Sequence, residues 1–367
     1  MRKYEGFNMD ALLIQASNHD YEVVFEAGVR HRLSEHIKKA YTSIHIISDE
    51  QVAGLYLSSI VKSLEADHQV HTSIVPAGEA SKSMEQYQYL LDRCVESKMD
   101  RNSLIIALGG GMIGDLAGFV ASTYLRGVEF WQMPTTILAH DSSVGGKVAI
   151  NHPAGKNLIG SFYNPAKVVY DIETLATLPD HELRSGYGEV VKHAMLSDKE
   201  WLFDLLNSRI DTLTKDHISN DLRKGIRVKA DIVEQDEREH GIRKHLNLGH
   251  TLAHALEAEL GYGTVTHGEA VAVGILFAMQ LSKDILHSDL PVDDYVNWLG
   301  KNHYPMKVLK EVSPEVLVKR MKWDKKAVDG KIHYILLEQI GTPILHQISD
   351  KELHRHLNRF YSEVVYS

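Results

Sequence analysis

The 367-residue chain contains a single cysteine, Cys94, so no disulfide can form within one chain. Cys94 lies in the pattern YQYLLDRCVESKM, whose apolar residues recur at helical spacing. A free cysteine in such a pattern is more often a half-buried packing residue than a nucleophile. The cysteine content therefore excludes a disulfide-stabilised scaffold and gives no support to thiol catalysis.

Long apolar runs are also absent. The longest fall well short of the roughly 18 residues that a membrane-spanning helix needs. In the opening segment MRKYEGFNMDALLIQ, Glu5 and Asp10 interrupt any apolar stretch, and no small-residue cleavage site follows. We therefore expect neither a membrane span nor a secretory signal, and we expect a cytoplasmic protein.

Basic charge is scarce, because 40 Lys and Arg face 49 Asp and Glu, for a formal net charge of −9. Nucleic acids are held by clustered Lys and Arg, so nucleic acid is not an expected partner. Any anionic ligand must instead meet a local basic pocket.

The apolar content of 44% is ordinary for a globular protein, and the length exceeds that of a usual single core. We expect two domains that share a cleft.

Between about Tyr41 and Asp171, short apolar runs alternate with helical patterns: SIHIIS, VAGLYLSSIVKSL, HTSIVP, a helix from Ser83, SLIIALGGG, a further helix and FWQMP. This alternation predicts an α/β domain with a mostly parallel sheet. The earlier segment YEVVFEAG predicts an additional hairpin or edge strand. After Pro179 helical periodicity dominates, with few strand signals until KIHYILLEQIG. The Thr-Leu-Pro break in ETLATLPDHEL places the boundary near residues 175 to 180.

A glycine-rich turn follows one of the predicted strands, in SLIIALGGGMIGDLAG. Gly109, Gly111 and Gly114 satisfy G-x-G-x-x-G between a strand and a helix, where backbone N–H groups can accept a pyrophosphate. Glycines also mark ordinary tight turns, so the motif alone leaves a structural turn as an equal alternative. The turn follows several α/β units instead of the first strand, unlike the usual dinucleotide fingerprint.

Two other loops follow predicted strands, SDEQ at 48–51 and PAGEASKS at 76–83. Loops at the carboxyl ends of parallel strands converge on a ligand. Asp49 can accept from a ribose hydroxyl, and Glu79 with Lys82 can contact ribose and phosphates. The alternative for each is a solvated loop charge.

The segment 133–165, MPTTILAHDSSVGGKVAINHPAGKNLIGSFYNP, is dense in small and hydroxyl residues. A surface loop of this length without a function would be unusual. Its glycines allow close backbone approach to a ligand, while Lys147 and Lys156 supply point charges for phosphate. We predict a long ligand-binding loop.

A possible metal site appears in the second half. Glu189 lies in SGYGEVVKHAM, His250 and His254 in NLGHTLAHALE, and His267 in THGEAVAVG. His250 and His254 share one helical face, although chance pairs are expected among 22 histidines. Two His and one Glu with an open position describe a catalytic zinc site.

Basic and amide side chains accompany these candidate ligands in sequence. Lys192 follows Glu189 by three residues, Asn247 precedes His250 by three, and Lys229 and Arg243 lie between. In an acidic protein they are candidates for binding carboxylate and phosphate groups. A solvated helix face is the alternative for any one of them alone.

These segments together resemble the 3-dehydroquinate synthase family, sugar phosphate cyclases of the shikimate pathway. The matching pieces, in order over roughly residues 45 to 330, are SDEQV, PAGEASKS, ALGGGMIGDLAGFVASTYLRG, MPTT, DSSVGGK, NHPAGKN, GYGEVVK, LNLGHTLAHALE, HGEAVAVG and DKK. Several long motifs in fixed order are highly specific. The resemblance implies an α/β fold with an N-terminal Rossmann-like NAD-binding domain at 1–178, a mainly α-helical metal- and substrate-binding domain at 179–367, and a homodimer.

The resemblance also implies residue roles. One divalent metal per subunit, zinc or cobalt, is held by Glu189, His250 and His267, which makes His254 a substrate-side or proton-relay residue and not a ligand. For NAD it implies Asp49, Glu79, Lys82, Gly110, Gly111, Asp115, Thr135, Thr136, Asp141, Lys147, Lys156 and Thr177. For substrate binding it implies Arg126, Asn157 and Lys326, the last in preference to Lys325, and for catalysis His254, Asn247, Lys147, Lys192, Lys229 and Arg243. The segment LAHDSSVGGK is one residue shorter than the family's frequent LAQVDSSVGGK, which affects the loop around Asp141.

The implied substrate is the anionic sugar 3-deoxy-D-arabino-heptulosonate 7-phosphate, converted to 3-dehydroquinate and phosphate on the route to chorismate and the aromatic amino acids. The implied steps are transient oxidation by NAD, β-elimination of phosphate, reduction, ring opening and intramolecular aldol closure. NAD is then a catalyst. Because NADH must not escape between steps, we expect the cleft to close on binding.

Three alternatives remain at this point. An NAD- and metal-dependent polyol dehydrogenase shares this architecture, but a neutral polyol would not require Lys147, Lys192, Lys229 and Arg243. Another sugar phosphate cyclase, making an inosose or a valienone-type ring, is closer; Arg243 suits a carboxylate and favours the dehydroquinate branch. A non-catalytic binding module conflicts with the complete set of metal, cofactor and acid-base candidates.

Overall fold

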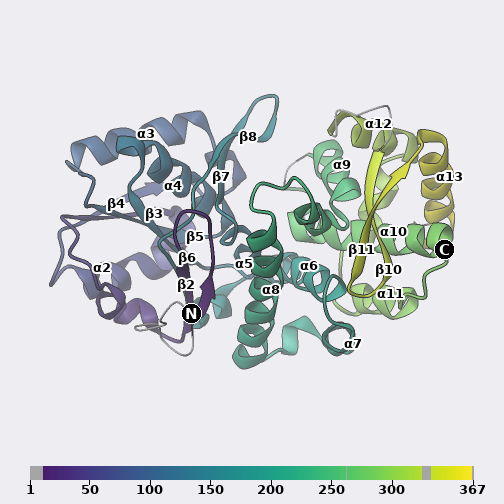
Figure 1. The fold of residues 1–367 in the computed structure, drawn as a ribbon, viewed down its shortest axis with the longest axis horizontal. Coiled ribbons are helices and arrows are strands. Elements are labelled where there is room, and N and C mark those ends of the chain that lie inside the picture. The colour runs from purple at the N-terminus through teal and green to yellow at the C-terminus, as the bar shows by residue number, and fades with distance from the viewer. Residues whose placement is uncertain (1–10, 262, 325–331, 366–367) are drawn as a thin grey trace. The chain divides into compact units, whose positions relative to one another are not determined.

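The computed structural model describes residues 11–261, 263–324 and 332–365, and its internal contacts divide the chain after Leu178 into an N-terminal unit and a C-terminal unit (Figure 1). The N-terminal unit is built on a twisted sheet with helices on both faces, and the C-terminal unit is mainly helical. The α/β class predicted from the alternating pattern is therefore confirmed.

The sheet of the N-terminal unit has seven strands in the order β1-β2-β9-β6-β5-β3-β4. The β1–β2 pair is antiparallel, and every other pairing is parallel. This confirms both the mostly parallel sheet and the hairpin predicted at YEVVFEAG. The strands are β1 (Leu12–Ile14), β2 (Tyr21–Glu26), β3 (Ile44–Asp49), β4 (Val70–Val75), β5 (Leu104–Gly109), β6 (Glu129–Pro134) and β9 (Lys167–Asp171).

The central strands β3 and β5 are buried at every residue, which is why both read as nearly continuous apolar runs. On one face of the sheet α3 (Met84–Glu96) and α4 (Gly111–Thr123) close a core, and on the other α2 (Ser58–Leu64) closes a second. Cys94 of α3 is fully buried in the first core, and burial raises the pKa of its thiol to about 12. The predicted packing role of this cysteine is confirmed.

The segment 133–165 departs from its prediction as one long loop. It contains a short helix, α5 (Ala139–Ser142), and an antiparallel hairpin of β7 (Lys147–His152) and β8 (Gly155–Phe162). Its longest apolar runs, ILA at 137–139 and VAI at 148–150, are three residues long, so the local pattern carries little strand signal. Val148 and Ile150 nevertheless pack into the core of the N-terminal unit, and this tertiary contact decides the conformation.

The C-terminal unit is organised around α10 (His267–Leu286), in which every residue from Gly268 to Met279 is buried. A helix that is apolar on all sides belongs inside a bundle, and α10 packs against α6, α9, α11 and α13 (Figure 1). The other helices are α6 (Asp180–Met195), α7 (Lys199–Asn207), α8 (Lys215–Gln235), α9 (His250–Leu260), α11 (Val292–Lys301), α12 (Pro314–Asp324) and α13 (Asp350–Phe360).

One hairpin completes this unit, formed by β10 (Ile332–Gln339) and β11 (Thr342–Ile348). The strand predicted at KIHYILLEQIG is β10, whereas β11 was not predicted.

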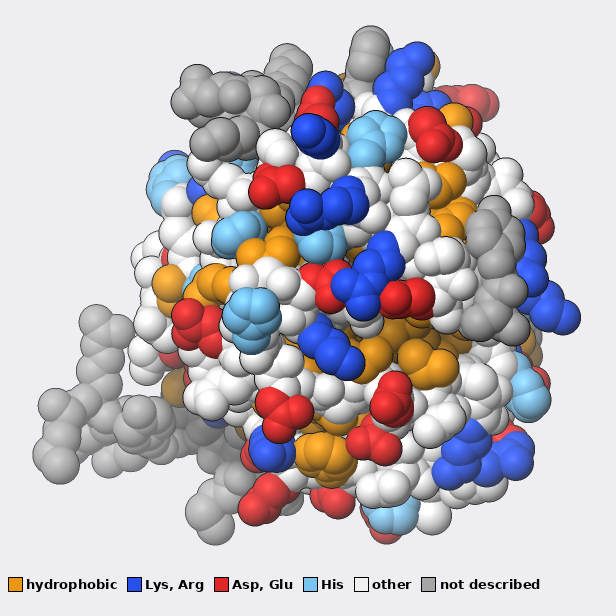
Figure 2. All heavy atoms as spheres, turned by 90° about the vertical axis from the view of Figure 1, so that its right-hand side faces the viewer, with side chains coloured by type: hydrophobic (Ala, Val, Ile, Leu, Met, Phe, Trp, Pro, Cys, Tyr) orange, Lys and Arg blue, Asp and Glu red, His pale blue; other side chains and the backbone are white. Residues whose placement is uncertain are grey.

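On the face that Figure 2 presents, basic and acidic side chains are interspersed with apolar atoms. Exposed ion pairs of this unit, such as Lys322 with Asp350 and Arg359 with Glu363, contribute little stability. None of the described helices is long and apolar enough to cross a bilayer.

Candidate active site

In the N-terminal unit the predicted ligand residues gather at the carboxyl edge of the sheet. Strand β3 ends at Asp49 and its neighbour β5 ends at Gly109. The chain order reverses between these strands, because β4 lies on one side of β3 and β5 on the other. Open α/β sheets bind ligands at such a switch point. The glycine turn is thus well placed although it does not follow the first strand.

The glycine turn leads directly into α4, whose N-cap is Gly110. A Cβ on Gly109 would lie 2.8 Å from the Ile113 side chain, and a Cβ on Gly111 would lie 3.0 Å from Ser142 Oγ. The turn therefore has no room for side chains, and its backbone N–H groups combine with the helix dipole to favour an anion. Thr135 N–H donates to the Gly109 carbonyl at 3.1 Å, which brings the predicted residues Thr135 and Thr136 beside this turn.

Three other predicted cofactor and substrate residues contact one another. The Lys82 ammonium, 4% exposed, pairs with Asp115 of α4 and donates to Asn157 Oδ1 at 2.5 Å. Asp49 accepts the N–H groups of Gln51 and Val52, each at 3.0 Å, and so caps α1 (Glu50–Val52). Of the rest, Asp141 lies in α5, Lys147 and Lys156 in the β7–β8 hairpin, and Arg126, with a left-handed φ of 69°, in a 3₁₀ turn after α4.

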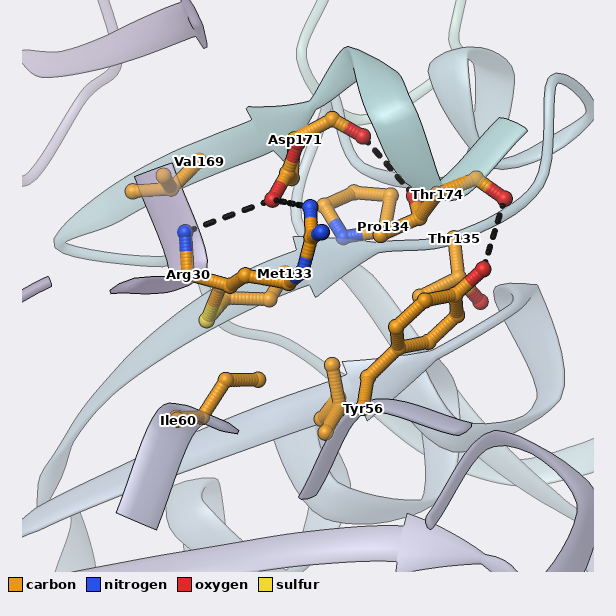
Figure 3. Close-up of a pocket in the computed structure, with 10 residues that line it drawn as sticks. Arg30, Tyr56, Ile60, Met133, Pro134, Thr135, Val169, Asp171 and Thr174 are labelled. Carbon is orange, nitrogen blue, oxygen red and sulfur yellow. Dashed lines mark hydrogen bonds and ion pairs between the residues drawn. The ribbon is translucent and has the colours of Figure 1, made fainter. Parts of the chain in front are cut away.

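A small pocket at the ends of β6 and β9 is lined by residues that include Tyr56, Thr135 and Thr174 (Figure 3). Thr177 ends the 3₁₀ turn Ile172–Thr177 that follows β9. Its hydroxyl is 2.5 Å from the Tyr56 hydroxyl, which also donates to the Thr174 carbonyl at 3.1 Å. Arg30, which was not predicted as a functional residue, pairs with buried Asp171 at 2.6 Å. The pocket volume is about 10 Å³, room for one water at most. The hydrogen bonds and the ion pair around the pocket hold the ends of β6 and β9 in place, and in this conformation the pocket is too small for a nucleotide.

In the C-terminal unit the three predicted metal ligands meet. Glu189 comes from the middle of α6, His250 begins α9 and His267 begins α10. Glu189 Oε1 is 3.3 Å from His250 Nε2 and 3.3 Å from His267 Nε2, and the candidate ligand atoms all lie within 4.8 Å of one another. One carboxylate and two imidazoles in this arrangement are a donor set for a divalent metal with an open position.

Both histidines are oriented by bonds to their second ring nitrogen. His250 Nδ1 is 3.1 Å from the Leu248 carbonyl, and His267 Nδ1 is 3.0 Å from Glu257 Oε2. Each Nδ1 therefore carries a proton, and each Nε2 faces Glu189, as in metal sites whose outer partners fix the ligands. Glu257 was not predicted, although its position seven residues after His250 places it on the same face of α9.

Close helix contacts at glycine bring the three ligands together. A Cβ on Gly188 would lie 2.1 Å from the Gly268 carbonyl oxygen, and a Cβ on Gly274 would lie 2.0 Å from that of Gly249. Three of these four glycines directly neighbour a ligand in sequence, since they precede Glu189, follow His267 and precede His250. The glycines in GYGEVVK, LGHTL and HGEAV thus let α6, α9 and α10 approach backbone to backbone.

The electrostatics of this cluster distinguish its histidines. Burial lowers the pKa of His250 to about 4, so its imidazole is neutral and able to ligate. Burial also opposes the charged form of His267, but hydrogen bonds to Glu189 and Glu257 prevail and raise its pKa to about 10. Lys192 Nζ lies 2.5 Å from Glu189 Oε2, and both side chains are 1% exposed. The buried negative charge of Glu189 is therefore compensated before any metal binds.

The remaining predicted residues of this unit are placed as follows. His254 packs its ring against those of His250 and His267, with centroids 5.5 and 6.0 Å away. Lys229 of α8 and Arg243 in the following 3₁₀ turn, Ile242–Asn247, are buried. Asn247 donates to Glu239 Oε1 at 2.9 Å. Lys326 lies outside the described residues.

Comparisons with known proteins cover almost the whole chain. Residues 72–185 match the model for the 3-dehydroquinate synthase N-terminal region, and residues 186–327 match that for its C-terminal region. A 3-dehydroquinate synthase from Bacillus mycoides is 49% identical over 363 residues, 97% of this chain and 100% of the relative. One from Oceanobacillus iheyensis is 45% identical over 352 residues, 96% and 98% of the two chains.

A solved structure with the same fold is that of 2-deoxy-scyllo-inosose synthase complexed with carbaglucose-6-phosphate, NAD+ and Co2+. Its TM-score is 0.87 at 24% identity, over 95% of this chain and 99% of that one. The identity to the curated relatives is about twice as high, and it extends through both units. The chain belongs to the 3-dehydroquinate synthase family and is a lyase.

Proposed function

We propose that this enzyme acts on 3-deoxy-D-arabino-heptulosonate 7-phosphate with NAD and one divalent metal ion, zinc or cobalt, as a cytoplasmic homodimer. The observation that carries the proposal is the convergence of Glu189, His250 and His267 on one point. A sugar phosphate cyclase of the same fold contains NAD+ and Co2+ in its solved structure. When bound, NAD+ would supply reversible hydride transfer, and the metal would lower the pKa of a substrate hydroxyl.

For the metal, Glu189 and the two Nε2 atoms of His250 and His267 would be the ligands. Lys192, in contact with Glu189, both balances its charge and orients it. His254, packed against both ligand rings, is in a position to relay a proton from a substrate hydroxyl, with Asn247 as its partner in this proposal. His254 would thus act as the acid-base group beside the substrate hydroxyl that is oxidised.

For the cofactor, the turn at Gly110 and Gly111 and the N-terminus of α4 would receive the pyrophosphate. Asp49 is fixed by its cap bonds at the neighbouring strand end, where a carboxylate suits a ribose hydroxyl. The further contacts proposed for NAD are Glu79, Lys82, Asp115, Thr135, Thr136, Asp141, Lys147, Lys156 and Thr177.

For the substrate, cationic side chains would hold its two anionic ends. Arg243 suits the carboxylate because a guanidinium binds it in a bidentate manner. The groups proposed for the phosphate and hydroxyls are Arg126, Lys147, Asn157, Lys192, Lys229 and Lys326. The departing phosphate can itself take the proton during elimination, so these side chains need mainly to position it.

The test is an assay of phosphate release from the heptulosonate phosphate by metal-loaded enzyme with catalytic NAD, while absorbance reports NADH. Phosphate release without stoichiometric NADH is expected. NADH that accumulates on polyols without phosphate release would indicate a dehydrogenase instead. Cyclisation of a hexose phosphate in preference to the heptulosonate would indicate an inosose-forming cyclase.

A further inference from the structure

Asn151, near the end of β7, joins residues that the proposed function assigns to different ligands. Its Nδ2 donates to Glu79 Oε1 at 2.8 Å, and its Oδ1 accepts the Asn157 N–H at 3.0 Å. Its own backbone N–H donates to the Lys82 carbonyl at 2.7 Å. Glu79 and Lys82 belong to the proposed NAD contacts and Asn157 to the proposed substrate contacts. One side chain thus touches both sets.

A second link closes this network. The Lys82 ammonium contacts Asp115 and also donates to Asn157 Oδ1 at 2.5 Å. Asn157 has a φ of 55°, in the left-handed region that non-glycine residues adopt at a cost. The bonds from Asn151 and Lys82 hold both its backbone N–H and its side chain in this conformation. The orientation of Asn157 therefore depends on residues of the cofactor set.

The chemistry of the amide explains why asparagine stands at position 151. A carboxylate only accepts and a backbone N–H only donates, so the residue between Glu79 and Asn157 needs one donor and one acceptor on a short stem. Aspartate would place two carboxylates 2.8 Å apart while still accepting from Asn157. Alanine would leave neither bond.

We infer that Asn151 is a positioning residue that couples NAD binding to substrate binding. It fixes Glu79 on the cofactor side and Asn157 on the substrate side within one hydrogen-bonded network, so that occupation of the NAD site stabilises the substrate-binding conformation of Asn157. By linkage, substrate favours NAD to the same extent. This inference rests on the proposed function, because Glu79, Lys82 and Asn157 are ligand contacts only within it.

The experiment compares wild type, N151D, E79Q and the double variant E79Q/N151D as full-length, metal-loaded enzyme. Calorimetry gives the Kd for NAD, and steady-state assays give kcat and the KM for the heptulosonate phosphate. N151D should raise the Kd for NAD by about 10- to 100-fold, as expected when a charge-assisted bond becomes a like-charge contact. N151D should also raise the KM for the heptulosonate phosphate, by a factor several times larger than the factor by which it lowers kcat. This is expected even though the new carboxylate would still accept the Asn157 N–H.

Because Glu79 is itself a proposed NAD contact, the single variant E79Q is the reference for the double variant. E79Q/N151D reverses donor and acceptor across the 2.8 Å contact, and N151D should therefore change both constants far less in the E79Q background than in wild type. N102D adds the same charge at an exposed turn of the same unit and should leave both constants unchanged. A changed NAD Kd with an unchanged substrate KM would overturn the coupling, and so would the absence of rescue by E79Q. If wild type itself binds no NAD, the proposed function fails and this inference fails with it. If wild type binds NAD and turns over the heptulosonate phosphate but N151D leaves both constants unchanged, the inference alone is overturned.

Discussion

The two units hold their site residues in different ways. In the N-terminal unit Asp49, the glycine turn and Thr135 follow the ends of parallel strands, so the site consists of loop backbone and short side chains. In the C-terminal unit Glu189, His250 and His267 project from helices. A loop can adapt to a ligand, whereas three helices place ligand atoms through their packing. The C-terminal site should therefore be the more sensitive to changes in packing.

Glycine serves a different purpose in each unit. At Gly109 to Gly111 the missing side chains leave backbone N–H groups accessible to an anion. At Gly188, Gly268 and Gly274 they let one helix or turn touch another, and Gly188 and Gly268 directly neighbour the candidate metal ligands Glu189 and His267 in sequence. The same residue type thus exposes backbone in one unit and buries it in the other.

The largest expected effect follows from Gly268→Ala. Its Cβ would lie 1.7 Å from the Ser185 carbonyl oxygen, so α6 and α10 must separate. We expect the free energy of unfolding of the C-terminal unit to fall by more than about 4 kcal/mol, with loss of the metal site. Chemical unfolding followed by circular dichroism measures this. Gly300→Ala is the matched control, because a Cβ on this glycine of α11 meets nothing within 4 Å. Equal stability of the two variants would contradict the packing argument.

The second prediction separates ligand from neighbour. His250→Ala should abolish bound metal and turnover, while the N-terminal unit stays folded and still binds NAD, because the substitution removes one of the three candidate ligands. His254→Ala should keep the metal and lose turnover. Metal content by mass spectrometry and NAD titration give the two readouts. Full metal retention by the His250 variant would refute the assigned ligand set.

The third prediction concerns pH and the N-terminal unit. His45 is fully buried and bonded to Ser73 at 2.8 Å; burial, then the charges of His71 and Arg93, lower its pKa from 6.5 to about 4. Between pH 6.5 and 4 the unfolded chain binds a proton that the folded chain does not, so stability falls as pH falls, by about 3 kcal/mol. Above pH 6.5 the contribution is constant.

His45→Gln should remove most of this loss, which urea unfolding at pH 6.5 and 4.5 can detect. His31→Gln, at an exposed histidine of the same unit, is the control and should behave like wild type. An identical acid dependence in the His45 variant and wild type would show that other groups destabilise the protein in acid.

The smallest effect is expected from Glu257→Gln. The amide of glutamine still accepts a hydrogen bond from His267 Nδ1, but it lacks the negative charge that strengthens this bond. Removal of such an outer partner usually weakens metal binding by about 10- to 100-fold. Competition with a chelating dye measures the affinity directly. Glu259→Gln, two residues later on the exposed side of α9, should leave it unchanged. Weakening by both variants alike would indicate a general loss of charge.

Much of the fold and of the candidate site could be predicted from the sequence alone. The alternating apolar runs predicted the parallel sheet, and the motifs around Glu189, His250 and His267 predicted candidate metal ligands, which the structure brings together. These features can be predicted because their sequence patterns are local: a buried strand is a short apolar run, and each candidate ligand lies beside a glycine in a short motif. The resemblance to one family then supplied the reaction, which the comparisons support along the chain.

Tertiary structure alone decided the rest. The hairpin of β7 and β8 forms because Val148 and Ile150 reach a core made by distant helices, although its own sequence resembles a loop. The roles of Glu257 and Asn151 could not be predicted from the sequence, because each depends on a hydrogen bond to a distant residue. Glu257 bonds to His267, and Asn151 bonds to Glu79. Sequence periodicity records which face of an element is buried, but the partner of a polar side chain depends on how the elements pack.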